Sequence, residues 1–102
     1  MDKLFIVVIE WNLKGDAGHD ILAVTTAEHI KECFKMFVEV EKSETYLQDF
    51  FNEDGTLKEG AMAELAEYTD TDTSFMLATS DYEYYTEISI REKTIWKTNA
   101  QE

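Results

Sequence analysis

The sequence contains no proline, a single cysteine and only four glycines among its 102 residues. The lone thiol, Cys33, cannot form an intramolecular disulfide, and this is typical of proteins in a reducing compartment, so we expect a cytoplasmic protein. The glycines are scattered, and no stretch has the composition of a linker or an internal repeat. These absences predict one domain over residues 1–102, with a folded core at 3–97 and a frayed tail at 98–102.

Long hydrophobic runs are also missing. The apolar run at residues 4–9 is far shorter than the ~20 residues that a membrane-spanning helix needs. It also lacks the small-residue cleavage site of a secretory signal. The sequence therefore predicts neither a membrane span nor a signal peptide.

Basic residues are scarce, with 9 Lys and Arg against 22 Asp and Glu and a net charge of −13. Phosphate groups are bound by cations, so this balance argues against direct binding of nucleic acid or of an anionic membrane. The electrostatically favoured partner is a basic protein or a cation, although a net charge of one sign also serves solubility alone. Eleven acids fall within residues 39–72. The candidate acidic patch within that stretch comprises Glu59, Glu64, Glu67, Asp70 and Asp72.

Strand patterns occur at both ends of the chain. Residues 3–12 are mostly β-branched or aromatic, which predicts a strand, and turn residues at 13–18 followed by apolar residues at 19–24 predict its hairpin partner. Near the other end, residues 75–79 and 84–95 predict two more strands. The last one alternates, with Tyr84, Ile88 and Ile90 on one face and Tyr85, Glu87, Ser89 and Arg91 on the other.

Two capping-box patterns in the middle of the chain predict helix starts, one at Thr25 with Glu28 and one at Thr56 with Glu59. The first helix carries an apolar stripe, and helical spacing predicts that it resumes as far as residue 51, before a turn at 52–55. The second presents Leu57, Ala61, Leu65 and Tyr68 on one face. The resulting order, ββααββ, predicts an α+β domain with a mainly antiparallel four-stranded sheet and helices mostly on one face.

This arrangement leaves one face of the sheet without helices. Both alternating faces of the first strand are apolar, so the face away from the helices needs a cover, and we expect a homodimer or another protein partner. Aromatic side chains commonly anchor such interfaces, although they also pack across strands. The candidate interface residues are Phe5, Val7, Trp11, Tyr84 and Tyr85, with Leu4, Ile6 and Val8 as the alternative set on the first strand.

Residues that carry chemistry are few and scattered. His29 and Cys33 with His19 offer at most three ligands, one fewer than a structural zinc site needs, so neither a metal nor another cofactor is predicted. The acidic turn at 52–55 does not match a calcium-binding EF-hand, because Phe50 and Ala61 fall on obligatory ligand positions. The sequence also lacks a nucleophile elbow and a phosphate-binding glycine loop.

Three hypotheses of function follow. The first is an interaction or regulatory module without catalytic activity, which binds itself or another protein, for which a basic surface is electrostatically favoured. The second is an inhibitor that mimics nucleic acid, because helical acids three or four apart, such as Glu64 and Glu67, lie about 5–6 Å from one another. The third is a small enzyme that uses buried carboxylates or His19, which requires a pocket lined by converging polar groups.

Overall fold

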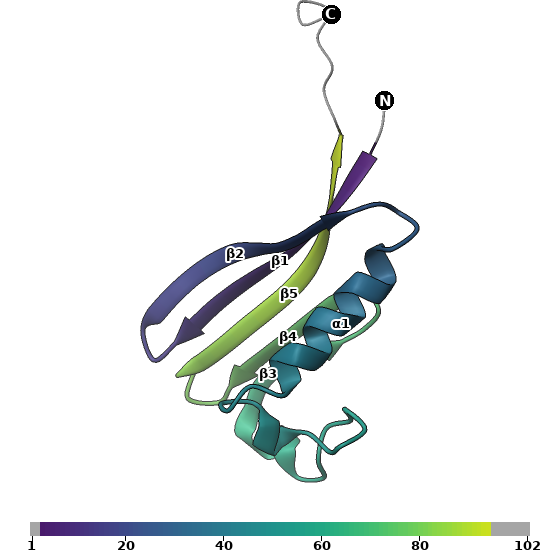
Figure 1. Ribbon diagram of the computed structural model, residues 1–102. Coiled ribbons are helices and arrows are strands. Elements are labelled where there is room, and N and C mark those ends of the chain that lie inside the picture. Colours follow the sequence, from purple (N-terminus) through teal and green to yellow (C-terminus); the bar gives the residue numbers. More distant parts are fainter. Residues whose placement is uncertain (1–2, 95–102) are drawn as a thin grey trace, which may run out of the picture.

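The computed structural model describes residues 3–94 of the chain, in which two strands are followed by a helical region and three further strands (Figure 1). The predicted α+β class is confirmed. The predicted tail at 98–102 lies outside the described residues, as do the last residues of the predicted core. The elements are β1 (Lys3–Leu13), β2 (Asp16–Thr25), α1 (Ile30–Lys42), the short 3₁₀ helices η1 (Gln48–Phe50) and η2 (Ala61–Glu64), β3 (Leu65–Asp70), β4 (Ser74–Thr79) and β5 (Tyr84–Thr94).

The strands form one five-stranded sheet in the order β2-β1-β5-β4-β3, and every neighbouring pair is antiparallel. The central strand β5 pairs with β1 along the full length of both strands, from Lys3 opposite Thr94 to Leu13 opposite Tyr84. The first and last described strands therefore lie side by side. β2 and β3 are the two edges of this sheet. The sheet is therefore antiparallel as predicted, but it has five strands and not four.

The β1–β2 hairpin fixes the register of the first two strands. Lys14 and Gly15 form its two-residue turn with positive φ angles of 54° and 90°. Such turns match the right-handed twist of the flanking strands. The Asn12 side chain accepts a hydrogen bond of 2.9 Å from the backbone N–H of Gly15, which supports the turn. Val8 consequently pairs with Ile21, after a bulge in β2 that shifts the register between Val7 and Val8.

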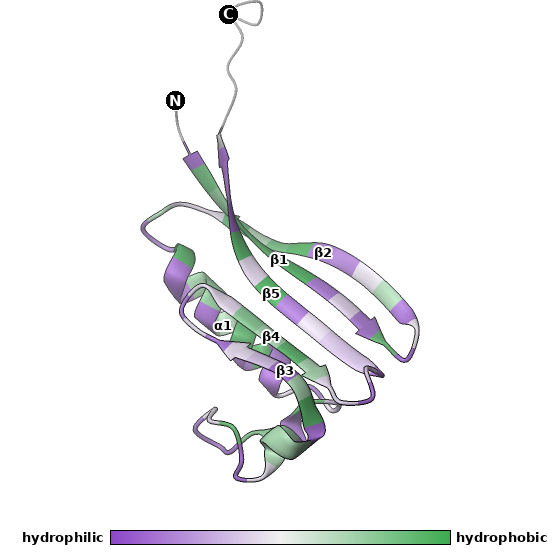
Figure 2. Ribbon diagram, turned by 180° about the vertical axis from the view of Figure 1, so that it is seen from behind, coloured by the Kyte–Doolittle hydropathy of each residue, from purple (hydrophilic) through white to green (hydrophobic). Residues whose placement is uncertain are grey.

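α1 covers one face of the sheet (Figure 1). Its apolar stripe, Ile30, Phe34 and Val38, is buried and belongs to the same core as side chains of β1, β4 and β5. Fully buried members on the strands include Val7, Phe75, Leu77 and Ile88, none of which exposes any surface. No helix of the described part of the chain covers the opposite face of the sheet, which Figure 2 shows from behind, with α1 on the far side. We call this uncovered side the open face.

The first helix starts later than its capping-box pattern predicts. Thr25 does not cap the helix, because it ends β2 and pairs with Phe5 of β1. The residue at the N-cap is His29, which makes no side-chain capping hydrogen bond. Strand pairing of a β-branched threonine has thus taken precedence over a local helix signal.

The predicted second helix is wrong. Thr56 instead donates hydrogen bonds to Asp54 from both its backbone N–H and its hydroxyl, and closes a small loop in which Phe51 forms a β-bridge with Leu57. Gly60 then adopts a left-handed φ of 85°, which a helix cannot accommodate. The segment continues as η2 and as the edge strand β3, so the second half of the predicted helix is a strand. The predicted resumption of the first helix to residue 51 is limited to the single turn η1.

Within residues 3–94, every helix is too short and too polar to cross a bilayer. The longest, α1, has 13 residues. The order of the larger segments otherwise follows the prediction: a hairpin, a helical region, and a second group of antiparallel strands.

Candidate protein interface

The predicted interface residues divide between the two faces of the sheet. Phe5, Val7 and Trp11 point toward α1, and Val7 is fully buried in the core, so this set does not contribute to the open face. Tyr84 also lies on the α1 side, where its ring stacks on Tyr46 with centroids 6.0 Å apart. Only Tyr85 lies on the open face.

The alternative set of the first strand, Leu4, Ile6 and Val8, occupies the open face. Side chains alternate along a strand, and these three are out of phase with the buried Val7. The hairpin register places Val24 beside Ile6 and Ile21 beside Val8. Ile21 is 56% exposed and Val24 is 54% exposed, which is high for large apolar side chains. These five residues form one apolar region, which we call the apolar patch of the open face.

Polar and charged side chains of β5 lie beside this patch on the open face, and β4 adds Ser74, Met76 and Ala78. β5 contributes Tyr85, Glu87, Ser89 and Arg91, as the predicted alternation requires, and the Arg91 guanidinium lies 3.3 Å from the carboxylate of Glu10 on β1. Both partners of that ion pair are about half exposed, so its contribution to stability is small. The Tyr85 hydroxyl donates a 2.9 Å hydrogen bond to Glu87.

The pKa of Tyr85 reflects the acidic surroundings on this part of the open face. Burial raises the pKa of its phenol, and the neighbouring carboxylates of Glu87, Glu10 and Glu67 raise it further, to about 12. The phenol therefore stays protonated and donates its hydrogen bond at any physiological pH. The open face thus combines an apolar patch with a polar region in which three acids, Glu10, Glu67 and Glu87, outnumber the cations Arg91 and Lys93.

The five residues of the predicted acidic patch do not share one surface. Glu67 pairs with Ala78 on the open face, whereas Asp70 pairs with Phe75 and points to the α1 side. Glu64 ends η2, and Glu67 follows it in a strand, so the expected helical spacing of these two acids is wrong. Asp72 lies in the β3–β4 turn and Glu59 precedes η2. The regular row of carboxylates that nucleic-acid mimicry requires is not formed by this set.

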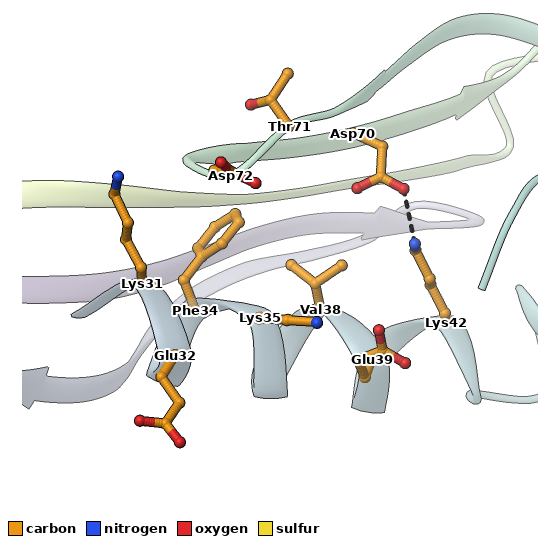
Figure 3. Close-up of a pocket in the computed structure, with 10 residues that line it drawn as sticks. All are labelled: Lys31, Glu32, Phe34, Lys35, Val38, Glu39, Lys42, Asp70, Thr71 and Asp72. Carbon is orange, nitrogen blue, oxygen red and sulfur yellow. Dashed lines mark hydrogen bonds and ion pairs between the residues drawn. The ribbon is translucent and has the colours of Figure 1, made fainter. Parts of the chain in front are cut away.

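A groove lies between α1 and the β3–β4 turn, with a volume of about 480 Å³ (Figure 3). Phe34 and Val38 point from the helix toward the strands, and Lys42 reaches Asp70 across the end of the groove. Its ten lining residues are Lys31, Glu32, Phe34, Lys35, Val38, Glu39, Lys42, Asp70, Thr71 and Asp72.

Lys42, the most buried cation of this groove, is fully engaged in the fold. Its ammonium donates to the Asp70 carboxylate at 2.7 Å and to the Gly55 carbonyl at 2.8 Å. The same ammonium lies 5.1 Å from the ring centre of Phe51 and 5.8 Å from that of Phe75, within cation–π range. Because Lys42 already has these partners, its role in the groove is structural.

A second groove of about 530 Å³ is lined in part by Tyr46, the hydrogen-bond partner of Glu41. Glu41 is the only carboxylate with a raised pKa among the described residues. Burial raises the pKa of Glu41, and the charge of Glu44 adds to the rise. The Tyr46 hydroxyl donates a hydrogen bond to Glu41. The buried Thr86 hydroxyl lies close enough to offset part of the rise, although its geometry falls short of a hydrogen bond. The groove itself is lined by Tyr46, Asp49, Phe50, Ala63, Glu64, Thr79, Ser80, Asp81 and Tyr84.

The residues that line this groove give little support to the enzyme hypothesis. Neither histidine nor Cys33 lines the groove. His19 pairs with Glu10 on the open-face side of the hairpin, His29 precedes α1, and Cys33 lies within it. Across residues 3–94, no group of three or more potential metal ligands comes together.

Comparison of the chain with protein-family models, with curated proteins and with solved structures found no significant match. Within residues 3–94, the fold defines a class: an α+β domain with a five-stranded antiparallel sheet that α1 covers on one face, while no helix covers the other. Function is therefore inferred from the residues of the open face.

Sequence reasoning missed Ile21 and Val24 as members of this surface. The signal was present in the Lys14-Gly15 turn, because a two-residue hairpin turn fixes which residues of the two strands lie side by side. Strand pairing counted outward from that turn brings apolar residues of β2 close to Ile6 and Val8. The bulge in β2, which turns Ile21 and Val24 to the same face, carries no comparable signal.

Proposed function

We propose that this domain is a non-enzymatic protein-interaction module that works through the open face of its sheet. The observation that carries the proposal is the exposure of the apolar patch, where Ile21 and Val24 each leave more than half of their surface in water. Fully burying an aliphatic side chain of this size is worth roughly 1.5–3 kcal/mol. Contiguous exposed apolar side chains on one face are typical of binding surfaces.

The surroundings of the patch support a protein as the ligand. The open face of a sheet is broad and suits the flat surfaces that proteins bury, whereas small molecules bind in concave pockets. The acids Glu10, Glu67 and Glu87 beside it disfavour nucleic acid and anionic lipid as direct ligands. The proposal requires no cofactor, and a cytoplasmic setting suits the free thiol of Cys33.

Site-specific photo-crosslinking tests this proposal. A photoreactive phenylalanine analogue replaces Ser89, in the middle of the open face, in cells that make the protein naturally. The matched control carries the analogue at Lys35, an exposed position of α1 on the other side of the molecule. We expect covalent protein adducts from position 89, whether with a second copy or with another protein, and few or none from position 35. An absence of adducts at position 89, or equal adducts at both positions, would overturn the proposal.

A further inference from the structure

Two of the three charged residues that β5 places on the open face, Glu87 and Arg91, lie symmetrically about Ser89, and the third, Lys93, lies beyond Arg91. Glu87 lies two positions before Ser89 and Arg91 lies two positions after it, and residues two apart on a strand point to the same face. Each of these two side chains is therefore about 7 Å along the strand from Ser89, in opposite directions. Ser89, which is small and uncharged, therefore lies between the negative Glu87 and the positive Arg91 of the same strand.

The row through Ser89 also forms one end of the apolar patch, with Ile6 and Val24 on one side of it and Glu10 and His19 on the other. Ser89 pairs with Val8 of β1, and Val8 pairs with Ile21 of β2, so the three residues form one row across the open face. Ile6 lies two residues from Val8 along β1 and is opposite Arg91. The row Ile21–Val8–Ser89 therefore joins the most exposed part of the apolar patch to the point midway between Glu87 and Arg91.

Resting on the interaction surface proposed above, we propose that the open face binds a second copy of this chain, related by a twofold axis that runs along the row Ile21–Val8–Ser89. This axis lies midway between the two stacked sheets and runs perpendicular to their strands. It therefore places β5 of one protomer over β5 of its partner, with the two strands running in opposite directions. Arg91 of one protomer then meets the partner's Glu87, and the symmetry forms this ion pair twice.

The spacing of stacked sheets suits this contact. Sheets pack face to face about 10 Å apart, a gap that an arginine and a glutamate reaching toward one another can span. The small Ser89 and the aliphatic Val8 and Ile21 leave the axis free of bulky or charged side chains. An isologous interface places residue i against residue j and j against i. Here the row Ile21–Val8–Ser89 meets itself, while Ile6 lies over the partner's Glu10.

Charge explains why this register is favoured over others. Each copy carries a net charge of −13, so two copies repel unless cations and anions are matched at the contact. An axis at Ser89 matches Arg91 with Glu87, whereas an axis through Glu87 places that carboxylate against itself. Like-charge contacts of that kind are strongly disfavoured at interfaces.

Charge-reversal variants distinguish a homodimer from a complex with a basic partner protein. R91E places two acids against one another in the homodimer, and E87R places two arginines together, so either change weakens self-association. The double variant restores both ion pairs with their signs exchanged. A basic heterologous partner predicts a different pattern, because R91E makes the open face more acidic and strengthens its binding.

Sedimentation equilibrium of the full chain measures these effects. We expect R91E and E87R each to raise the dimer dissociation constant at least about tenfold, and the double variant to return within about threefold of the native value. The controls K35E and E39R make the same charge changes on exposed positions of α1, and should leave the constant nearly unchanged. Circular dichroism of each variant verifies that the sheet is retained. S89R, which places an arginine against itself on the axis, is a second disrupting variant.

A monomeric native chain, single reversals that act no more than their controls, or a double variant that stays weak would each overturn the homodimer. A monomeric chain that still yields adducts to another protein from position 89 overturns this inference and leaves the proposed function standing.

Discussion

The ammonium of Lys42 lies 2.7 Å from the carboxylate of Asp70, and this pair joins the end of α1 to the edge strand β3. The Lys42 side chain is 11% exposed, and the Tyr68 hydroxyl donates a second hydrogen bond of 2.9 Å to the same Asp70 oxygen. Burial, together with the Asp70 carboxylate, raises the pKa of Tyr68 well above its usual range, so this donor keeps its proton. The pair therefore positions the outer half of the sheet beneath the helix.

Replacing Lys42 with Met tests how much that pair stabilises the fold. The substitution retains the aliphatic length but leaves Asp70 with Tyr68 alone, and it removes the donor to Gly55. We expect the free energy of unfolding in urea to fall by about 2 kcal/mol, less than for a fully buried pair because Asp70 is partly solvated. Lys35→Met is the matched control on the exposed side of α1. An equal loss in both variants would show that the pair contributes nothing specific.

Val7 and Val8 are adjacent valines on opposite faces of β1, and lysine at each gives opposite outcomes. Val7 is fully buried, so Val7→Lys places an ammonium in the core and costs about 4 kcal/mol or more, which is enough to unfold a marginally stable domain. Val8 lies on the open face, so Val8→Lys leaves the chain folded. Circular dichroism and urea unfolding distinguish the two. A folded Val7→Lys protein would mean that the two faces of β1 are assigned the wrong way round.

Gly18 leaves room for the ring of Trp11 on the α1 side of the hairpin. A Cβ atom at position 18 would lie 2.5 Å from the Trp11 ring, closer than any real contact, so the ring must move. We expect Gly18→Ala to destabilise the domain by about 1–3 kcal/mol. It should also shift the fluorescence of Trp11, measured in a Trp96→Phe background. Ala17→Ser, at an exposed neighbouring position, should change neither; an unshifted spectrum for Gly18→Ala would contradict this packing.

The raised pKa of Glu41 gives the domain a pH dependence with a definite sign. Its folded-state pKa is above the unfolded value, so its contribution to stability is fully present below the usual pKa of glutamate and is lost as the pH rises through the folded-state value. Glu41→Gln removes this titration. Relative to the native protein, we expect the variant to gain stability as the pH rises above the usual pKa of glutamate, measured by urea unfolding. A stability difference that does not vary with pH would contradict the assigned cause.

The features that could be predicted from the sequence are those with a strong local period. β1, the β1–β2 turn, the apolar stripe of α1 and the alternation of β5 all follow from side chains that repeat every two or about four residues. The two faces of β5 were predicted correctly residue by residue. The polar side chains of that strand identify the open face.

The features that could not be predicted depend on contacts between distant residues. Leu57, Ala61, Leu65 and Tyr68 have helical spacing, yet Leu65 and Tyr68 belong to a strand that pairs with β4. Tyr68 packs edge-on against Phe75 across that pair, a tertiary contact that outweighs the local preference. Likewise, both faces of β1 are apolar, so the sequence offered two sets of interface residues, and only the position of α1 distinguishes them.

The mass of the native chain in solution tests the central claim most directly. Light scattering coupled to size-exclusion chromatography, at tens of micromolar protein, should give twice the chain mass of 11.8 kDa, because the open face is covered by a second copy. Val8→Lys, with an unchanged circular dichroism spectrum, should give the mass of one chain. A native mass of 11.8 kDa across that concentration range, unchanged by Val8→Lys, would contradict the account.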